Sequence, residues 1–253
     1  MLPRFLGAID ARSATARLGE DEARHLSQVL RLHPGDEVAV FDGAGREFRA
    51  RVARVSRDGA DLALLDVAAA AAEPAVRLTL GQSVLKGDKM DDVVRDATMM
   101  GVTAVEPLIT AHTVAHMKAG AAPERWRRIA IASAKQCRRA VLPLIGAGMG
   151  FDDWLARDTA EVKLILVEPA ALSAVSGSGA DKPGADWTQD AQLQTRPASA
   201  SLLVGPEGGW STDEIDRAVR AGYRPLTLGR RTLRADAVPV VAISVLQYLW
   251  RDL

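Results

Sequence analysis

The sequence is short of the residues from which several kinds of site are built. Its 253 residues include one cysteine, Cys137, which excludes a disulfide framework, a CxxC redox pair and a thiolate zinc site. With only four histidines, a catalytic metal is not expected. Aromatic residues make up 4% of the chain, which disfavours a base-stacking platform for RNA.

The chain also lacks a charge excess and long apolar runs. Its 32 basic residues balance 32 acidic ones, so any site for a polyanion must be local. No stretch reaches about 18 uncharged apolar residues and no signal-peptide core opens the chain, so we expect a cytoplasmic protein that does not span a membrane. Hydrophobic residues make up 48% of the chain, enough for one large domain or two modest ones.

Hydrophobic periodicity predicts an α/β protein with a small β-domain in front. Residues 1–72 contain short stretches that alternate polar and apolar side chains, typical of an antiparallel barrel or sheet. The predicted strands are Val38–Phe41, Glu47–Val55 and Leu62–Val67, with a short helix at Asp21–Leu30. The alanine-rich run 68–73 is the predicted linker. From 76 to 253 strands alternate with helices, which predicts a mostly parallel sheet, and 170–200 is a predicted flexible insertion.

A glycine-rich loop follows the apolar run Leu202–Val204. It reads Gly205-Pro206-Glu207-Gly208-Gly209, and Ser211 with Glu214 has capping-box spacing for the next helix. Glycines let a ligand approach backbone N–H groups closely, although the spacing fits neither a phosphate loop nor GxGxxG. A tight strand-to-helix turn explains this segment equally well. The Glu207 carboxylate disfavours phosphate and favours a cationic or hydroxyl-bearing ligand.

A second loop follows the next strand and carries three arginines. Gly229 is followed by Arg230, Arg231 and Arg234. In a parallel sheet successive strand ends open on one edge, where ligands bind. The arginines are therefore candidates for contacts with RNA phosphates or a reacting base, and a solvated turn is the alternative.

The predicted helix between Pro123 and Arg139 is strongly basic. It carries one acidic residue, Glu124, against six cations, a local footprint for a polyanion. The six cations are Arg125, Arg127, Arg128, Lys135, Arg138 and Arg139. A solvated helix face remains the alternative. In the N-terminal part, His25 and Arg31 are either further RNA contacts or caps and core groups.

Together these motifs resemble the bacterial 16S rRNA uridine-N3 methyltransferases of the SPOUT superfamily. The similarity rests on GPEGG at 205–209, on LGRRTLR at 228–234 and on KGDKM at 86–90. Supporting matches are His25–Arg31, Phe41-Asp42-Gly43, Met100-Gly101-Val102, Lys135–Arg139 and Asp213-Glu214-Ile215. The resemblance spans nearly the whole chain.

The resemblance implies a PUA-like β-barrel at 1–72 and a trefoil-knotted α/β domain at 76–253. It also implies binding of S-adenosylmethionine, a homodimer, and methylation of N3 of one specific uridine in the 16S rRNA of the 30S subunit. The implied cofactor residues are Leu166, Val167, Gly205, Pro206, Glu207, Gly208, Gly209, Leu228, Gly229, Thr232 and Leu233. The implied RNA contacts are His25, Arg31, Arg128, Arg138, Arg139, Arg230 and Arg231.

For catalysis we expect Arg234 to stabilise the uridine anion and Asp236 or Glu207 to accept the proton. The chain departs from the family pattern near these residues: Ala235-Asp236 stands where a Thr-Glu pair is usual, and His112 where an arginine is usual. Three alternatives stay open. They are a methyltransferase for another rRNA or tRNA nucleotide, a non-catalytic RNA-binding assembly factor, and a nucleotide-cofactor oxidoreductase.

Overall fold

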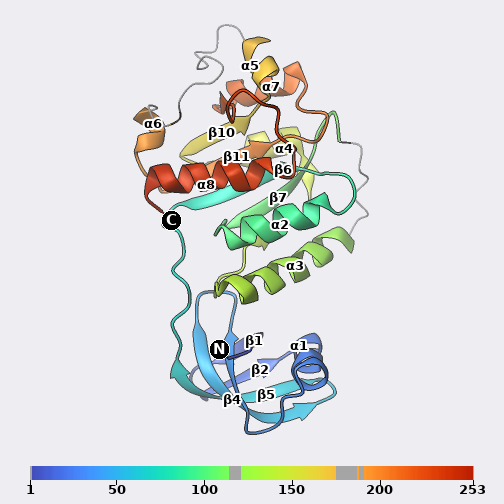
Figure 1. The fold of residues 1–253 in the computed structure, drawn as a ribbon, viewed down its shortest axis with the longest axis vertical. Helices are drawn as coiled ribbons and strands as arrows, with labels where there is room; N and C mark the ends of the chain where they lie inside the picture. Colours follow the sequence, from blue (N-terminus) through green and yellow to red (C-terminus); the bar gives the residue numbers. More distant parts are fainter. Residues whose placement is uncertain (1, 114–120, 175–186, 188–190, 253) are drawn as a thin grey trace. The chain divides into compact units, whose positions relative to one another are not determined.

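The computed structural model describes residues 2–113, 121–174, 187 and 191–252. The chain divides into two compact units (Figure 1). The first contains the residues up to 73 together with 131–142, and the second contains 74–130 and 143–253. The sequence predicts contiguous domains, whereas the structure groups 131–142 with the first unit because this segment packs and hydrogen-bonds there.

The first unit is a closed five-stranded barrel, as the PUA-like resemblance implies. The strands are β1 (Arg4–Asp10), β2 (Thr15–Leu18), β3 (Glu37–Phe41), β4 (Glu47–Ser56) and β5 (Gly59–Val67). Their order is β1-β2-β5-β4-β3, and a parallel β1–β3 pair closes the barrel. Closure leaves no free sheet edge. The predicted short helix is α1 (Glu20–Arg24) continued by the π-helical turn η1 (His25–Val29), and Leu26 of η1 is fully buried in the barrel core.

The second unit is built on a parallel sheet, which confirms the predicted fold class. Its strand order is β12-β10-β11-β6-β7-β8, with β9 also pairing with β7. The strands are β6 (Arg77–Ser83), β7 (Ala104–Ile109), β8 (Leu144–Ile145), β9 (Met149–Gly150), β10 (Val162–Leu166), β11 (Ser199–Val204) and β12 (Arg224–Leu226). The central strands read as apolar runs because helices cover both faces of the sheet.

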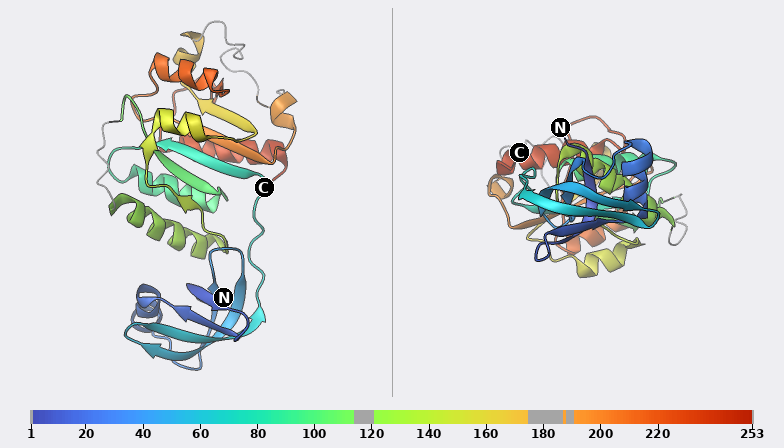
Figure 2. Two further views of the ribbon diagram at one scale, coloured as in Figure 1. Left: turned by 180° about the vertical axis from the view of Figure 1, so that it is seen from behind. Right: turned by 90° about the horizontal axis from the view of Figure 1, so that it is seen from below.

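Alternate residues of β11 explain how the two faces are covered. Leu202 and Val204 pack with α2, α3, α6 and α8, whereas Leu203 packs with α4 and α7 on the other face. In the left view of Figure 2, α4 (yellow) lies in front of the sheet and α8 (red) behind it. The helices are α2 (Lys89–Met99), α3 (Ala121–Cys137), α4 (Phe151–Arg157), α5 (Pro169–Ala174), α6 (Ala191–Gln194), α7 (Thr212–Arg220) and α8 (Val238–Trp250).

About half of the predicted insertion at 170–200, namely residues 175–186 and 188–190, lies outside the described residues. Two of its described residues are anchored: Trp187 and Leu193 are buried, and Trp187 Nε1 donates to the carbonyl of Thr227 at 3.0 Å. Within the described ranges, no helix is long and apolar enough to cross a bilayer. The threading of the C-terminal segment into a trefoil knot stays a prediction.

Candidate functional site

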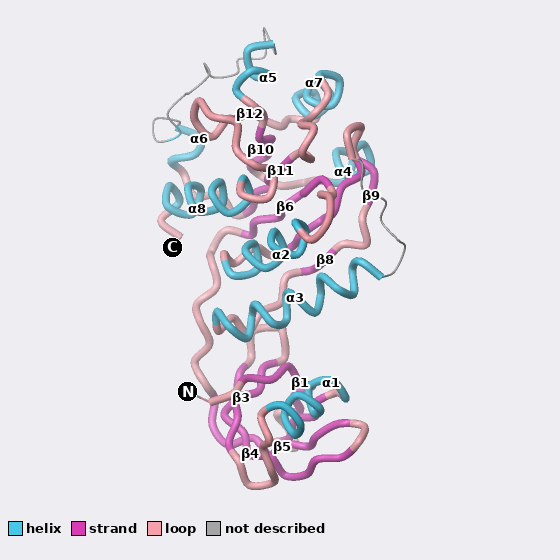
Figure 3. The backbone as a smooth tube through the Cα atoms, turned by 45° about the vertical axis from the view of Figure 1, so that its right-hand side comes forward, coloured by secondary structure: helices cyan, strands magenta, loops and turns pink. Residues whose placement is uncertain are grey.

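A cavity of about 520 Å³ opens at one edge of the parallel sheet, where β10, β11 and β12 end. Figure 3 shows the loops that follow these strands in pink. Strands β11 and β12 are not neighbours, because β10 lies between them and contributes Leu166 at its end. The two glycine-bearing loops nevertheless line one cavity. All predicted cofactor residues line it except Gly229, and so do the three predicted catalytic residues.

The GPEGG loop needs its glycines for steric reasons. A Cβ at Gly205 would lie 3.1 Å from Trp210 Nε1, which donates to the carbonyl of Leu166 at 2.9 Å. Gly209 has φ +69°, a left-handed conformation that favours glycine. The predicted capping box is confirmed, since the side chain of Ser211 accepts from the backbone of Glu214 and the reverse bond is also present. The loop therefore forms a cavity wall that is held by close packing against Trp210 and by the cap of α7.

Glu207 of this loop is held by a part of the chain that the sequence analysis did not assign to the site. Its Oε1 accepts from Lys89 Nζ at 2.6 Å and from the backbone N–H of Lys86 at 3.2 Å. Desolvation raises the pKa of Glu207, but the hydrogen bonds from Lys89 and the backbone outweigh it and leave the pKa below its ordinary value. The carboxylate is therefore charged near neutral pH.

The loop after β12 also lines the cavity, and it carries another ion pair. Arg234 lies 3.0 Å from Asp236, and this hydrogen bond holds the pKa of Asp236 below its ordinary value and raises that of Arg234. A lowered pKa makes Asp236 and Glu207 weaker proton acceptors near neutral pH. Arg234 is mostly exposed, so its guanidinium is free to exchange Asp236 for another anion.

The predicted RNA contacts of the second unit are all exposed. Arg230 and Arg231 lie on the loop after β12, and Arg231 also lines the cavity. Arg128 lies on α3. Their exposure suits contacts with a large polyanion.

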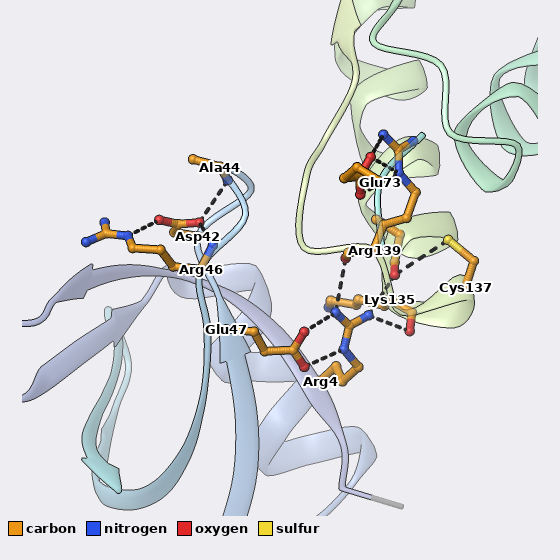
Figure 4. A network of polar contacts seen from close by, with 10 residues as sticks. Arg4, Asp42, Ala44, Arg46, Glu47, Glu73, Lys135, Cys137 and Arg139 are labelled. Atoms are coloured by element: carbon orange, nitrogen blue, oxygen red, sulfur yellow. Dashed lines mark hydrogen bonds and ion pairs between the residues drawn. The ribbon is translucent and has the colours of Figure 1, made fainter. Parts of the chain in front are cut away.

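The first unit holds a polar network at the C-terminal end of α3 (Figure 4). The guanidinium of Arg4 forms an ion pair of 2.7 Å with Glu47, and both side chains are about 95% buried. Arg4 also donates to the carbonyls of Ala134, Lys135 and Arg139, at 2.7, 3.0 and 3.0 Å. It thereby satisfies carbonyls that the end of a helix leaves without partners.

This network corrects the prediction for Arg139. Its side chain is 3% exposed and forms a 2.6 Å ion pair with Glu73, so its guanidinium is buried within the fold rather than presented at the surface. The adjacent Arg138 is exposed and has φ +68°, a conformation that a residue with a Cβ rarely adopts. Arg31 is also exposed with a positive φ of 55°, and His25 is exposed and packs edge-on against Phe5. Arg138, Arg31 and His25 stay predicted RNA contacts.

No group of three His, Cys, Asp or Glu side chains within the described ranges is arranged to hold a metal. The absence of a metal from the reaction stays a prediction.

Comparison with known families assigns both units. The family described as an RNA methyltransferase domain matches residues 72–247, and the family described as an RNA methyltransferase PUA domain matches 18–65. The first match alone covers more than half of the chain. The PUA match falls within the five-stranded barrel.

Relatives of known name give the same result. Ribosomal RNA small subunit methyltransferase E of Synechocystis is 33% identical over 236 residues, 93% of this chain and 74% of that relative. The Bacillus subtilis protein of the same name is 26% identical over 233 residues, 90% and 88% of the two chains. The crystal structure of the Neisseria gonorrhoeae protein of that name, bound to S-adenosylmethionine, superposes with a TM-score of 0.84 at 29% identity and covers 99% and 98% of the two chains. The chain thus belongs to the ribosomal RNA small subunit methyltransferase E family of RNA methyltransferases.

Proposed function

We propose that this protein transfers a methyl group from S-adenosylmethionine to N3 of one specific uridine in the 16S rRNA of the small ribosomal subunit. The observation that carries the proposal is the convergence of the GPEGG loop and the LGRRTLR loop on a single cavity, in a chain that belongs to this family. It acts in the cytoplasm as a homodimer, and its RNA contacts are His25, Arg31, Arg128, Arg138, Arg230 and Arg231.

The residues of the cavity fit S-adenosylmethionine in size, polarity and charge. About 520 Å³ is within the range of small-molecule pockets, roughly 300–1,000 Å³. Leu166, Val167, Leu228 and Leu233 provide apolar surface for a purine, while glycine backbone groups offer donors and acceptors. The charged carboxylates of Glu207 and Asp236 favour the cationic sulfonium. When bound, the cofactor supplies an electrophilic methyl group.

The protein's own part in the reaction is to hold the uracil and to manage its charge. N3 of uracil carries an imide proton, and its loss leaves an anion spread over N3 and the two carbonyl oxygens. The cavity is lined by three cations, Lys89, Arg231 and Arg234, of which we assign Arg234 to stabilise this anion. Arg234 is paired with Asp236, two residues away. Because the Arg234 side chain is exposed, its guanidinium can leave this carboxylate for the uridine anion at little cost.

The test is methyl transfer from labelled S-adenosylmethionine to purified 30S particles that lack the modification, followed by mapping of the modified nucleotide by mass spectrometry. Labelling of N3 of a single 16S uridine supports the proposal. Labelling of another nucleotide would reassign the target within the family. Tight binding of cofactor and 30S particles without any transfer would instead identify a non-catalytic assembly factor.

A further inference from the structure

A second hollow lies against the cofactor cavity. It measures about 510 Å³ and shares Glu207 and Gly208 with that cavity. We call it the outer hollow, and it is lined by Lys86, Ala111, His112, Thr113, Glu207 and Gly208. Methyl transfer needs the accepting atom about 3–3.5 Å from the methyl carbon, so the target base must occupy a space next to the cofactor. The outer hollow adjoins it, and its lining includes the charged or polar side chains of Lys86, His112, Thr113 and Glu207.

Among the described residues that line the outer hollow, His112 carries the one imidazole, and this ring has a defined orientation. His112 Nδ1 lies 3.0 Å from the carbonyl oxygen of Gly209. A carbonyl only accepts, so Nδ1 carries the hydrogen of this bond. In the neutral ring Nε2 is then a lone-pair acceptor. A side chain at Gly208 would crowd this approach, because its Cβ would lie 3.1 Å from the Cβ of His112.

The turn that carries His112 is fixed from the other side by α7. The backbone N–H of Ala111 donates to Glu214 Oε1 at 2.8 Å, and Glu214 is the buried carboxylate of the capping box. Thr110 and Thr113 close the turn through their hydroxyls at 2.8 Å. The Glu214 carboxylate therefore holds both Ser211, just after the GPEGG loop, and the turn that carries His112. A catalytic base needs neighbouring groups of this kind to keep its orientation fixed.

Resting on the proposed function, we propose that the outer hollow receives the target uracil and that His112 Nε2 is the base that removes its N3 proton. The N3–H bond breaks, its electron pair stays on N3, and the proton bonds to Nε2. The imidazolium then releases the proton to water. Glu207 and Asp236 are left to hold the cofactor and Arg234, in keeping with their ion pairs.

Imidazole is suited to this step because the neutral ring offers one nitrogen lone pair that can take up a proton, and histidine is the side chain most often used as a general base. Among the described residues, the charged groups around His112 are Lys86 from the loop after β6, Glu207 from the loop after β11, and Glu214 from α7. Lys86 is exposed and its ammonium is available to a uracil carbonyl oxygen.

The first test is single-turnover methylation of unmodified 30S particles between pH 6 and 9. We expect His112→Ala and His112→Asn to slow transfer by about 100- to 1,000-fold. Asn keeps a donor for the Gly209 carbonyl but has no basic nitrogen, so a purely structural histidine would be rescued by Asn. Affinity for S-adenosylhomocysteine, measured by calorimetry, should change by less than about threefold.

The second test changes the acidity of the substrate. In particles assembled with 5-fluorouridine-substituted rRNA the N3 proton is more acidic, so the deficit of His112→Ala should shrink by about tenfold or more. An undiminished deficit would overturn the proposal.

The third readout needs no turnover. In a ¹⁵N spectrum of histidine-labelled protein with S-adenosylhomocysteine, the resonances lost in His112→Ala should show a protonated Nδ1 and an unprotonated Nε2. The opposite tautomer of His112 would overturn the proposal that His112 is the base. Wild-type rates for both His112→Ala and His112→Asn would overturn it as well. Absence of uridine methylation by the wild-type protein would instead contradict the proposed function.

Discussion

The ion pairs of the barrel unit and those of the cofactor cavity use the same residue types for opposite purposes. Arg4 and Glu47 are almost fully buried, and Arg4 is held by three further carbonyls. Arg234 is 73% exposed and forms its ion pair with the nearby Asp236. A buried pair is costly to break because each charge is left without solvent, whereas an exposed pair exchanges partners at little cost. Burial therefore separates arginines that build the fold from arginines that are available to a substrate.

The largest expected effect is the loss of the buried pair. Arg4→Ala leaves Glu47 buried without a counter-charge and the end of α3 without its donor, so the free energy of unfolding should fall by about 3–5 kcal/mol. Urea denaturation followed by circular dichroism measures it. The matched control is Arg17→Ala, whose pair with Asp61 is about half exposed and is worth at most about 1 kcal/mol. Equal losses of unfolding free energy in the two variants would show that burial does not decide how much such an ion pair contributes to stability.

The counterpart in the cavity is Arg234→Ala, which should leave stability nearly unchanged and act on the reaction. We expect methyl transfer to fall by about 100- to 1,000-fold, because the uridine anion loses its cation. Affinity for S-adenosylhomocysteine should stay within about tenfold. Arg220→Ala, on the exposed side of α7, is the control. Equal loss of transfer and affinity would place Arg234 among the cofactor contacts.

The rigidity of the cavity wall is tested at Gly205. In Gly205→Ala the new methyl group meets the Trp210 ring at 3.1–3.3 Å, and overpacking of this kind costs about 1–3 kcal/mol. If the ring moves, the cavity changes shape, so affinity for S-adenosylhomocysteine should fall by about tenfold. Gly19→Ala is the control, since nothing lies within 4 Å of its Cβ. Unchanged affinity in Gly205→Ala would mean that the loop adapts.

The smallest effect is expected at Arg138, which is exposed, whereas its neighbour Arg139 is buried. Arg138→Gly removes a side chain from a left-handed position, so stability should rise by up to about 1 kcal/mol. If Arg138 contacts a phosphate, the slope of log affinity for RNA against log salt should flatten by about 0.7–0.9. Higher stability with an unchanged slope would show that Arg138 is merely solvated.

Several features of the site were predictable because they are local in sequence. The GPEGG and LGRRTLR loops each follow an apolar strand, and the capping box at Ser211 and Glu214 has a fixed spacing. The parallel sheet followed from the alternation of strands and helices. The position of β10 between β11 and β12 was not predictable, because strand order is not encoded in local periodicity.

Residues that join the site from distant parts of the chain were missed for the same reason. Lys89 pairs with Glu207 across 118 positions, and Ala111 bonds to Glu214 across 103. The burial of Arg139 was missed because its partner, Glu73, belongs to the run that had been predicted to be a linker. A lysine in the KGDKM motif was the one available signal for Lys89.

By itself, the sequence determined the α/β class, the family and the two glycine-bearing loops, because glycine placement and strand-helix alternation are dictated by backbone sterics over a few residues. Only the tertiary structure decided which charges are buried, which carboxylates are already paired and which ring nitrogen of His112 faces the carbonyl of Gly209. These properties depend on desolvation and on hydrogen bonds between segments about a hundred residues apart, and neither is fixed until the chain has folded.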